Sequence, residues 1–138
     1  MDRPQHYRFH QGDRALPFDA AEYDARLAGL RATMAREGLT ACVLTSMHNV
    51  AYYSGFLYCA FGRAYGLVVT AEDSVVIAAG IDGAQPWRRC HGDAITYTDW
   101  ARDNFWRTVA HVTGAGGRIG FEADHLTLVQ HDRLMVHL

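Results

Sequence analysis

Lysine is absent from this 138-residue sequence, in which all 13 cationic side chains are arginines. This absence excludes a lysine nucleophile, a Schiff base and the lysine of a phosphate-binding loop. No stretch approaches the roughly 20 consecutive apolar residues of a membrane-spanning helix. The N-terminus also lacks the apolar core of a signal peptide. We therefore expect a cytoplasmic protein that has no membrane partner.

The sequence also has few cysteines and little net charge. Cys42, Cys59 and Cys90 are odd in number and far apart, so they match neither a disulfide framework nor a zinc knuckle, and they are typical of a reducing compartment. The formal net charge is −2. Without a basic surface, nucleic-acid binding is not expected. Because 49% of the residues are hydrophobic, the chain is long and apolar enough to form one folded domain rather than a disordered segment.

Motifs for metals and nucleophiles are missing as well. The eight histidines form no H-E-x-x-H motif, and the last three recur every six residues and so share no helix face. His6 and His10 have no acidic partner close by in the sequence. No serine lies in a G-x-S-x-G motif. A lone thiol nucleophile at Cys59 stays open, although no histidine pairs with it in the sequence. We expect neither a metal nor a cofactor.

The first predicted helix carries the clearest boundary signals. Asp19 is a candidate N-cap with Glu22 three residues later, and Phe18 and Tyr23 are placed to form a hydrophobic staple. Apolar residues then recur at steps of three and four: Tyr23, Leu27, Leu30 and Met34. Gly38 is typical of a helix C-terminus. These signals predict one amphipathic helix that buries a single face.

Hydrophobic periodicity predicts further helices and strands along the rest of the chain. Helices are expected over 47–54, 83–90, 104–112 and 126–137, and strands over 40–46, 66–70, 74–79, 94–98 and 118–122. A three-residue turn joins two of these strands into a β-hairpin, whereas the others are reached through helices. In the final helix, Leu126, Val129, Leu134 and Leu138 are expected to face inward.

This pattern predicts an α/β fold. We expect a three-layer domain over 18–138, in which helices flank a mixed β-sheet, preceded by an irregular N-terminal arm over 1–17. The sequence ends in an amphipathic helix that would normally lead to a further element. We therefore expect this chain to be part of a longer protein.

Residues 46–65 form the most unusual segment. They include one arginine, Arg63, and six aromatic residues: Tyr52, Tyr53, Phe56, Tyr58, Phe61 and Tyr65. A core segment would favour aliphatic residues over hydroxyls that need partners, whereas aromatic and arginine enrichment is typical of an interface or a ligand pocket. Gly62 permits an unusual turn between Phe61 and Arg63, whose guanidinium can hold a carboxylate through two parallel N–H···O bonds. Aromatic packing beside a surface arginine stays open as the simpler interpretation.

The segment 81–89 is a second candidate. Asp82 is placed to cap a helix there, and Trp87 with Arg88 and Arg89 could stack or meet an acidic partner. The simpler interpretation, a capped surface helix anchored by one tryptophan, is favoured.

Several short motifs resemble the N-terminal domain of the creatinase/prolidase/aminopeptidase P family. They are Thr45-Ser-x-His-Asn49, Tyr52-Tyr-Ser54, Phe56-Leu-Tyr-Cys59, Phe61-Gly-Arg63, Ile81-Asp-Gly83, Gln85-Pro-Trp-Arg-Arg89, Tyr97-Thr-Asp-Trp100, Arg102-Asp-Asn104 and Asp124-His-Leu126. The resemblance runs through nearly the whole chain. The Phe-Gly-Arg and Gln-Pro-Trp-Arg-Arg stretches together are similar to the creatinase branch of the family rather than to its peptidases.

The resemblance implies a mixed sheet with a ribonuclease H-like motif, within a two-domain homodimeric enzyme that hydrolyses creatine to sarcosine and urea without a metal. In that family a C-terminal pita-bread domain supplies the catalytic histidine and the glutamates that bind the guanidinium. This sequence lacks that domain, so no catalytic residue is expected in it and the chain alone should be inactive.

The same resemblance implies a role for two residues. The N-terminal domain covers the active site of the opposite subunit, and Phe61 and Arg63 are implied to hold the carboxylate end of a creatine-like small zwitterion. Ala64 departs from the family pattern, in which proline follows the arginine, and this leaves the pose of Arg63 open.

Two other functions stay open. The chain could be the N-terminal domain of a metal-dependent X-Pro dipeptidase or aminopeptidase P, in which Arg63 would hold another small zwitterion. It could also be a free-standing dimerisation or binding module.

Overall fold

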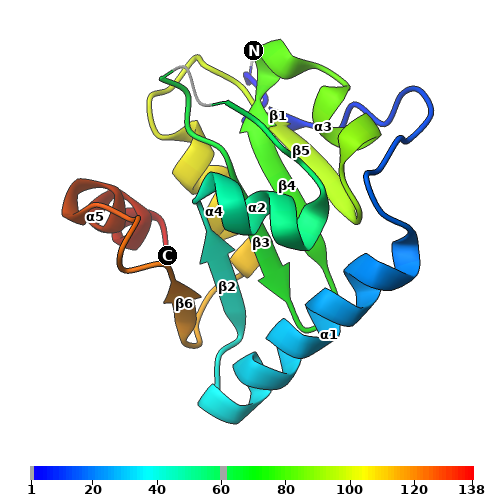
Figure 1. Ribbon diagram of the computed structural model, residues 1–138. Coiled ribbons are helices and arrows are strands. Elements are labelled where there is room, and N and C mark those ends of the chain that lie inside the picture. Colours follow the sequence, from blue (N-terminus) through cyan, green and yellow to red (C-terminus); the bar gives the residue numbers. More distant parts are fainter. Residues whose placement is uncertain (1, 60–61) are drawn as a thin grey trace.

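A six-stranded mixed sheet runs through the middle of the protein, with helices on both of its faces (Figure 1). The computed structural model describes residues 2–59 and 62–138. The strands are β1 (His6–Tyr7), β2 (Ala41–Leu44), β3 (Gly66–Thr70), β4 (Ser74–Ala79), β5 (Asp93–Tyr97) and β6 (Ile119–Phe121). The helices are α1 (Ala20–Glu37), α2 (Met47–Ser54), α3 (Gln85–Arg89), α4 (Asn104–Thr113) and α5 (Leu128–His137), and a 3₁₀ turn, η1 (Gly80–Asp82), precedes α3.

The strand order confirms the predicted mixed sheet. The strands lie in the order β1-β5-β4-β3-β2-β6. β3 pairs antiparallel with both of its neighbours, β2 and β4, and β3 and β4 form the expected hairpin. β4 pairs parallel with β5, and β2 pairs parallel with β6. Parallel neighbours need a long crossover connection, which explains why η1 and α3 lie between β4 and β5.

The strands separate two apolar layers, because successive side chains in a strand point to opposite faces. In β2, Cys42 and Leu44 pack in the layer under α1 and α2, whereas Val43 packs in the layer under α4 and α5. All four residues of β2 are buried, as its continuous apolar run predicts. The three-layer α/β architecture is therefore confirmed.

The boundaries of α1 follow the signals in the sequence. The side chain of Asp19 accepts a hydrogen bond from the backbone N–H of Glu22 (3.0 Å). The rings of Phe18 and Tyr23 meet edge-on with their centroids 6.2 Å apart, which is the expected staple. Gly38 ends the helix with φ 67°, a left-handed conformation that glycine adopts without strain.

The predicted inward face of α5 is partly wrong. Leu126 and Leu134 are buried as expected, but Val129 is 61% exposed and Leu138 is 39% exposed. The helix starts at a capping box formed by Thr127 and Gln130, so Leu126 precedes it and does not belong to its stripe. Leu134 sets the buried face, and Val129, five residues earlier, lies about 140° away around the helix.

The N-terminal arm is less irregular than its composition predicts. β1 pairs antiparallel with β5, with His6 opposite Tyr97 and Tyr7 opposite Thr96. The backbone N–H of Ala15 also donates to the carbonyl of Arg88 (2.8 Å). The arm therefore adds an edge strand to the sheet and packs along α3.

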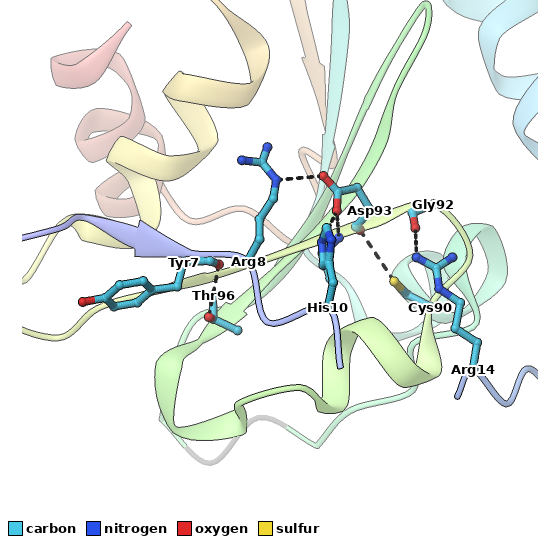
Figure 2. Close-up of polar contacts among 9 residues, drawn as sticks. Tyr7, Arg8, His10, Arg14, Cys90, Gly92, Asp93 and Thr96 are labelled. Atoms are coloured by element: carbon cyan, nitrogen blue, oxygen red, sulfur yellow. Dashed lines mark hydrogen bonds and ion pairs between the residues drawn. The ribbon is translucent and has the colours of Figure 1, made fainter. Parts of the chain in front are cut away.

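Asp93 ties this arm to the start of β5 (Figure 2). Its two carboxylate oxygens lie 3.0 Å from Nε of Arg8 and 2.7 Å from Nε2 of His10, and Arg14 donates to the carbonyl of Gly92 (2.6 Å). His10 has no acidic partner close by in the sequence, but the pairing of β1 with β5 brings in a carboxylate that is remote in the sequence.

Candidate functional site

Arg63 lies in the loop that leads into β3, beside the end of β5. Its Nη1 donates to the carboxylate of Asp99, and both side chains are about half exposed, at 43% and 50%. Gly62 has φ 85°, which confirms the unusual turn expected before Arg63. Phe61, the other residue that we expect to contact a substrate, lies outside the described residues.

Three tyrosine hydroxyls hold this loop in place. Tyr97 donates to the carbonyl of Ala64 (2.8 Å) and Tyr65 donates to the carbonyl of Tyr58 (3.1 Å). Tyr58 in turn donates to the carboxylate of Asp82 (2.9 Å). Asp82 therefore does not cap α3 as predicted, and the N-cap position of that helix, Ala84, has no side-chain hydrogen bond. Two hydroxyls of the aromatic segment, those of Tyr58 and Tyr65, therefore find partners within the domain.

Burial keeps these hydroxyls in their donor form. Burial raises the pKa of Tyr97 to about 12. It also raises the pKa of Tyr65 above its ordinary value, and burial together with the hydrogen bond to Asp82 raises the pKa of Tyr58. The three phenols therefore stay neutral across physiological pH, and the loop that carries Arg63 keeps its hydrogen bonds.

The aromatic segment lies partly in the core and partly on the surface. Phe56 is fully buried and its ring stacks on Tyr58 with a centroid distance of 5.5 Å. Tyr58 meets Tyr65 edge-on at 5.2 Å. Tyr52 is half exposed at 50%. The packed rings of Phe56, Tyr58 and Tyr65 lie beside the start of β3, close in the sequence to Arg63.

A cavity of about 370 Å³ lies next to this loop. Its apolar lining comes from Phe105 and Trp106 of α4, and its polar lining comes from Arg63, His125 and Arg133. The cavity thus joins the arginine loop to the segments around α5.

Glu122 anchors Thr45, one of the residues that line this cavity. Its carboxylate accepts hydrogen bonds from the backbone N–H groups of Thr45 (2.6 Å) and Ser46 (2.8 Å), and from the side chains of Ser46 and Asn49. Burial by itself raises the pKa of Glu122, but these hydrogen bonds outweigh burial and leave the pKa below its ordinary value. Nearby, Nδ1 of His125 lies 2.8 Å from the hydroxyl of Thr45. The sequence carries no local signal for this network.

Trp87 stacks, but not on its neighbours in the sequence. The guanidinium of Arg14 lies 3.5 Å from the centroid of the Trp87 ring, and the ring of His10 stacks on it at 3.9 Å. Arg89 donates to the carbonyl of Leu57 (2.9 Å). The 81–89 segment is therefore a docking point for the N-terminal arm.

The remaining candidates offer little reactive chemistry. Among residues 2–59 and 62–138, no three histidine, cysteine or acidic side chains form a group that could hold a metal ion. Cys42 and Cys90 are buried, and burial raises the pKa of Cys90 to about 12. Cys59 is exposed. In the same described ranges, no helix is both long and apolar enough to cross a membrane.

The geometry suits binding of an anionic group. An arginine that is half exposed, on a loop fixed by buried hydroxyls, can hold a carboxylate with little loss of conformational freedom. By itself it does not activate water or form a covalent intermediate.

The sequence matches a family model described as the Creatinase/Prolidase N-terminal domain over residues 26–138. The creatinase of Bacillus sp. (strain B-0618) is 46% identical over 122 residues, which cover 85% of this chain and 30% of that creatinase. The chain therefore spans less than a third of the length of that relative.

Solved structures share the fold. The Creatinase/Prolidase N-terminal domain of an X-Pro dipeptidase from Streptococcus pyogenes superposes with a TM-score of 0.73 at 19% identity, covering 83% of this chain and 88% of that one. A dipeptidase from Mycobacterium ulcerans superposes with a TM-score of 0.69 at 24% identity, covering 86% of this chain and 34% of that one.

Proposed function

Since this chain belongs to the Creatinase/Prolidase N-terminal domain family, we propose that it is the non-catalytic N-terminal domain of a creatinase-like amidinohydrolase, which converts creatine and water to sarcosine and urea. The 46% identity to a creatinase supports this assignment. The dipeptidase structures share the fold at 24% identity or less. Residues outside this sequence would carry out the catalysis, because the chain spans 30% of that creatinase.

We further propose that the domain covers the active site of a second subunit in a homodimer and that Arg63 binds the substrate carboxylate. The observation that carries this proposal is the pairing of Arg63 with the carboxylate of Asp99, beside the backbone carbonyl of Ala64 that Tyr97 holds. Phe61 would form an apolar wall beside the same carboxylate. The three free cysteines, Cys42, Cys59 and Cys90, support a cytoplasmic location.

The proposed role follows from the charges of the substrate. Creatine carries a guanidinium at one end and a carboxylate at the other. Holding both ends fixes the guanidinium carbon relative to the attacking water, and such positioning lowers the barrier. A covering domain also removes bulk water from the reacting centre. Arginine suits the carboxylate end because its planar fork makes two parallel hydrogen bonds.

The test is an assay of the full-length gene product with creatine. Arg63→Ala should weaken transition-state binding by roughly 2–4 kcal/mol, measured as kcat/KM. Arg63→Lys should restore part of the activity, because it keeps the charge but loses the fork. An unchanged kcat/KM in Arg63→Ala would overturn the assignment of Arg63.

Two further measurements separate this function from its alternatives. Hydrolysis of X-Pro dipeptides that a chelator abolishes, without hydrolysis of creatine, would indicate a metal-dependent peptidase instead. Titration of the 138-residue chain with creatine should show no appreciable binding, because the proposed site needs both subunits. Tight binding would indicate a free-standing binding module.

A further inference from the structure

We propose that Asp99 is a positioning residue that holds one corner of the Arg63 guanidinium, so that the opposite edge stays open for the substrate carboxylate. This inference rests on the proposed function, because it requires Arg63 to contact the substrate. It adds a residue from a separate element, the loop after β5, to the site.

The first argument is which nitrogen Asp99 uses. Nη1 of Arg63 donates to Oδ2 of Asp99. A guanidinium has five N–H donors. Within residues 2–59 and 62–138, Nη1 is the one nitrogen of Arg63 that donates to an acceptor. Nε and Nη2 form the side-on edge that binds a carboxylate through two parallel hydrogen bonds. Asp99 therefore binds the guanidinium at Nη1 and leaves the edge formed by Nε and Nη2 open.

The second argument is that one strand end holds both the guanidinium of Arg63 and the backbone next to Arg63. Tyr97, the last residue of β5, donates to the carbonyl of Ala64, directly after Arg63 (2.8 Å). Asp99 follows two residues later and holds the guanidinium. Hydrogen bonds to the guanidinium and to the neighbouring backbone together fix the direction of the side chain more tightly than either bond alone.

The third argument is that the segment carrying Asp99 is itself held from both sides. On one side, the backbone N–H of Thr98 donates to the carbonyl of Gln5 (2.9 Å), and Nε1 of Trp100 donates to the carbonyl of Pro4 (2.7 Å). On the other side, the amide of Asn104 donates to the carbonyl of Thr98 (2.8 Å). Asp99 is therefore presented by a well-braced turn, as a positioning residue requires.

The fourth argument concerns energy. Asp99 and Arg63 are both about half exposed, and exposed ion pairs contribute little to folding stability. The pair is thus poorly explained as a device that stabilises the fold. Its effect should appear in substrate binding, where the direction of the guanidinium matters.

The experiment measures steady-state kinetics of the full-length gene product with creatine. Asp99→Ala should raise KM about tenfold while kcat stays nearly constant, which is the size of coupling expected for two side chains in contact. Asp99→Asn keeps an oxygen acceptor for Nη1 and should recover part of this loss. Glu72→Ala is the matched control, because Glu72 is an exposed acid in the turn at the opposite end of β3. It should leave KM unchanged.

Two readouts separate positioning from a structural role. The carboxamide of creatine keeps the guanidino group but lacks the carboxylate, so Asp99→Ala should not alter KM for it. In an Arg63→Ala background, Asp99→Ala should cause no further loss, because its only route to the substrate has been removed. A general folding defect would lower activity with both substrates and in both backgrounds.

The outcomes distinguish this inference from the proposed function. If Arg63→Ala leaves kcat/KM unchanged, the proposed role of Arg63 fails and the role of Asp99 fails with it. If Arg63→Ala reduces kcat/KM but neither variant of Asp99 raises KM, only the role of Asp99 is overturned. A lower KM in Asp99→Ala also overturns it, because Asp99 would then be a competitor of the substrate.

Discussion

The hydroxyl of Tyr97 donates a hydrogen bond to the carbonyl oxygen of Ala64 across 2.8 Å, which joins the end of β5 to the loop before β3. Tyr97 is 6% exposed. Without this hydroxyl, the carbonyl of Ala64 would lose its hydrogen-bond donor. Ala64 directly follows Arg63, the residue that we assign to substrate binding. The position of Arg63 therefore depends on a neighbouring strand.

Removal of this hydroxyl should destabilise the domain. We expect Tyr97→Phe to lower the free energy of unfolding by about 1–2 kcal/mol, because it leaves a carbonyl without its donor. Urea denaturation of the 138-residue chain measures this change. Tyr7→Phe is the control, because Tyr7 is 44% exposed. Equal stability of the two variants would contradict the prediction.

Glu122 should contribute to stability through its charge. The charged oxygens accept from Thr45, Ser46 and Asn49, and Glu122→Gln turns one acceptor oxygen into an NH₂ group that faces these donors. We expect a loss of about 1–3 kcal/mol in the free energy of unfolding. Glu72→Gln, at an exposed turn, should change it little. A loss of similar size in both variants would argue against the network.

The lowered pKa of Glu122 also predicts a dependence on acid. A carboxyl whose pKa is lower in the folded state contributes stability that is complete above its unfolded pKa, about 4.3, and is lost as pH falls through the folded value. The native protein should therefore lose stability below about pH 4 more steeply than Glu122→Gln does. Urea denaturation at a series of pH values gives both curves. Parallel curves would show that Glu122 is not the cause.

Asp93 should hold the N-terminal arm on the domain. Burial raises the pKa of Asp93, but hydrogen bonds from Arg8 and from the N–H of Ala94, with the charges of Arg8 and His10, lower it overall. Asp93→Asn should speed trypsin cleavage after the arm arginines about fivefold, as expected for the loss of roughly 1 kcal/mol of local stability. Asp24→Asn is the control, because it removes a different exposed aspartate–histidine pair, with His91. Equal cleavage rates would refute the prediction.

A side chain at Gly92 should be poorly tolerated. Gly92 has φ +94°, and a Cβ there would collide with the backbone carbonyl of Ser74. We expect Gly92→Ala to cost about 2–4 kcal/mol of stability, from left-handed strain and from the collision. Gly116 has φ +80° with open space around it, so Gly116→Ala should cost only the strain, roughly 1–2 kcal/mol. Thermal unfolding of both variants compares the two contributions.

Local sequence signals predict most of the fold. The capping residue Asp19 and the terminating Gly38 define α1, and the hairpin of β3 and β4 matches its expected bounds. These features depend on residues that are close in the chain. The sequence does not predict β1, because two residues are too few to show an alternating pattern. The expected inward position of Val129 is wrong, because packing of Leu134 sets the phase of α5.

Only part of the candidate site can be predicted from the sequence, because local patterns do not show which distant residues meet. The arginine loop is visible in the sequence, since Gly62 and Arg63 follow a dense aromatic segment. The partners of the site are not, because Asp99 lies 36 positions from Arg63. Pairing of strands brings such residues together, and no local pattern encodes the register. Sequence reasoning therefore finds the arginine that we propose to bind the ligand, but misses the residue that we assign to hold it.

The parallel pairing of β6 with β2 has a consequence for the order in which the domain assembles. β3 and β4 meet across a short turn, whereas Glu122, which follows β6, reaches Thr45 from 77 positions away. Closing so long a stretch of chain costs entropy before any contact is gained. We therefore expect β6 to dock late during refolding, so that the amide protons of Thr45 and Ser46 become protected from exchange with solvent after those of the central hairpin.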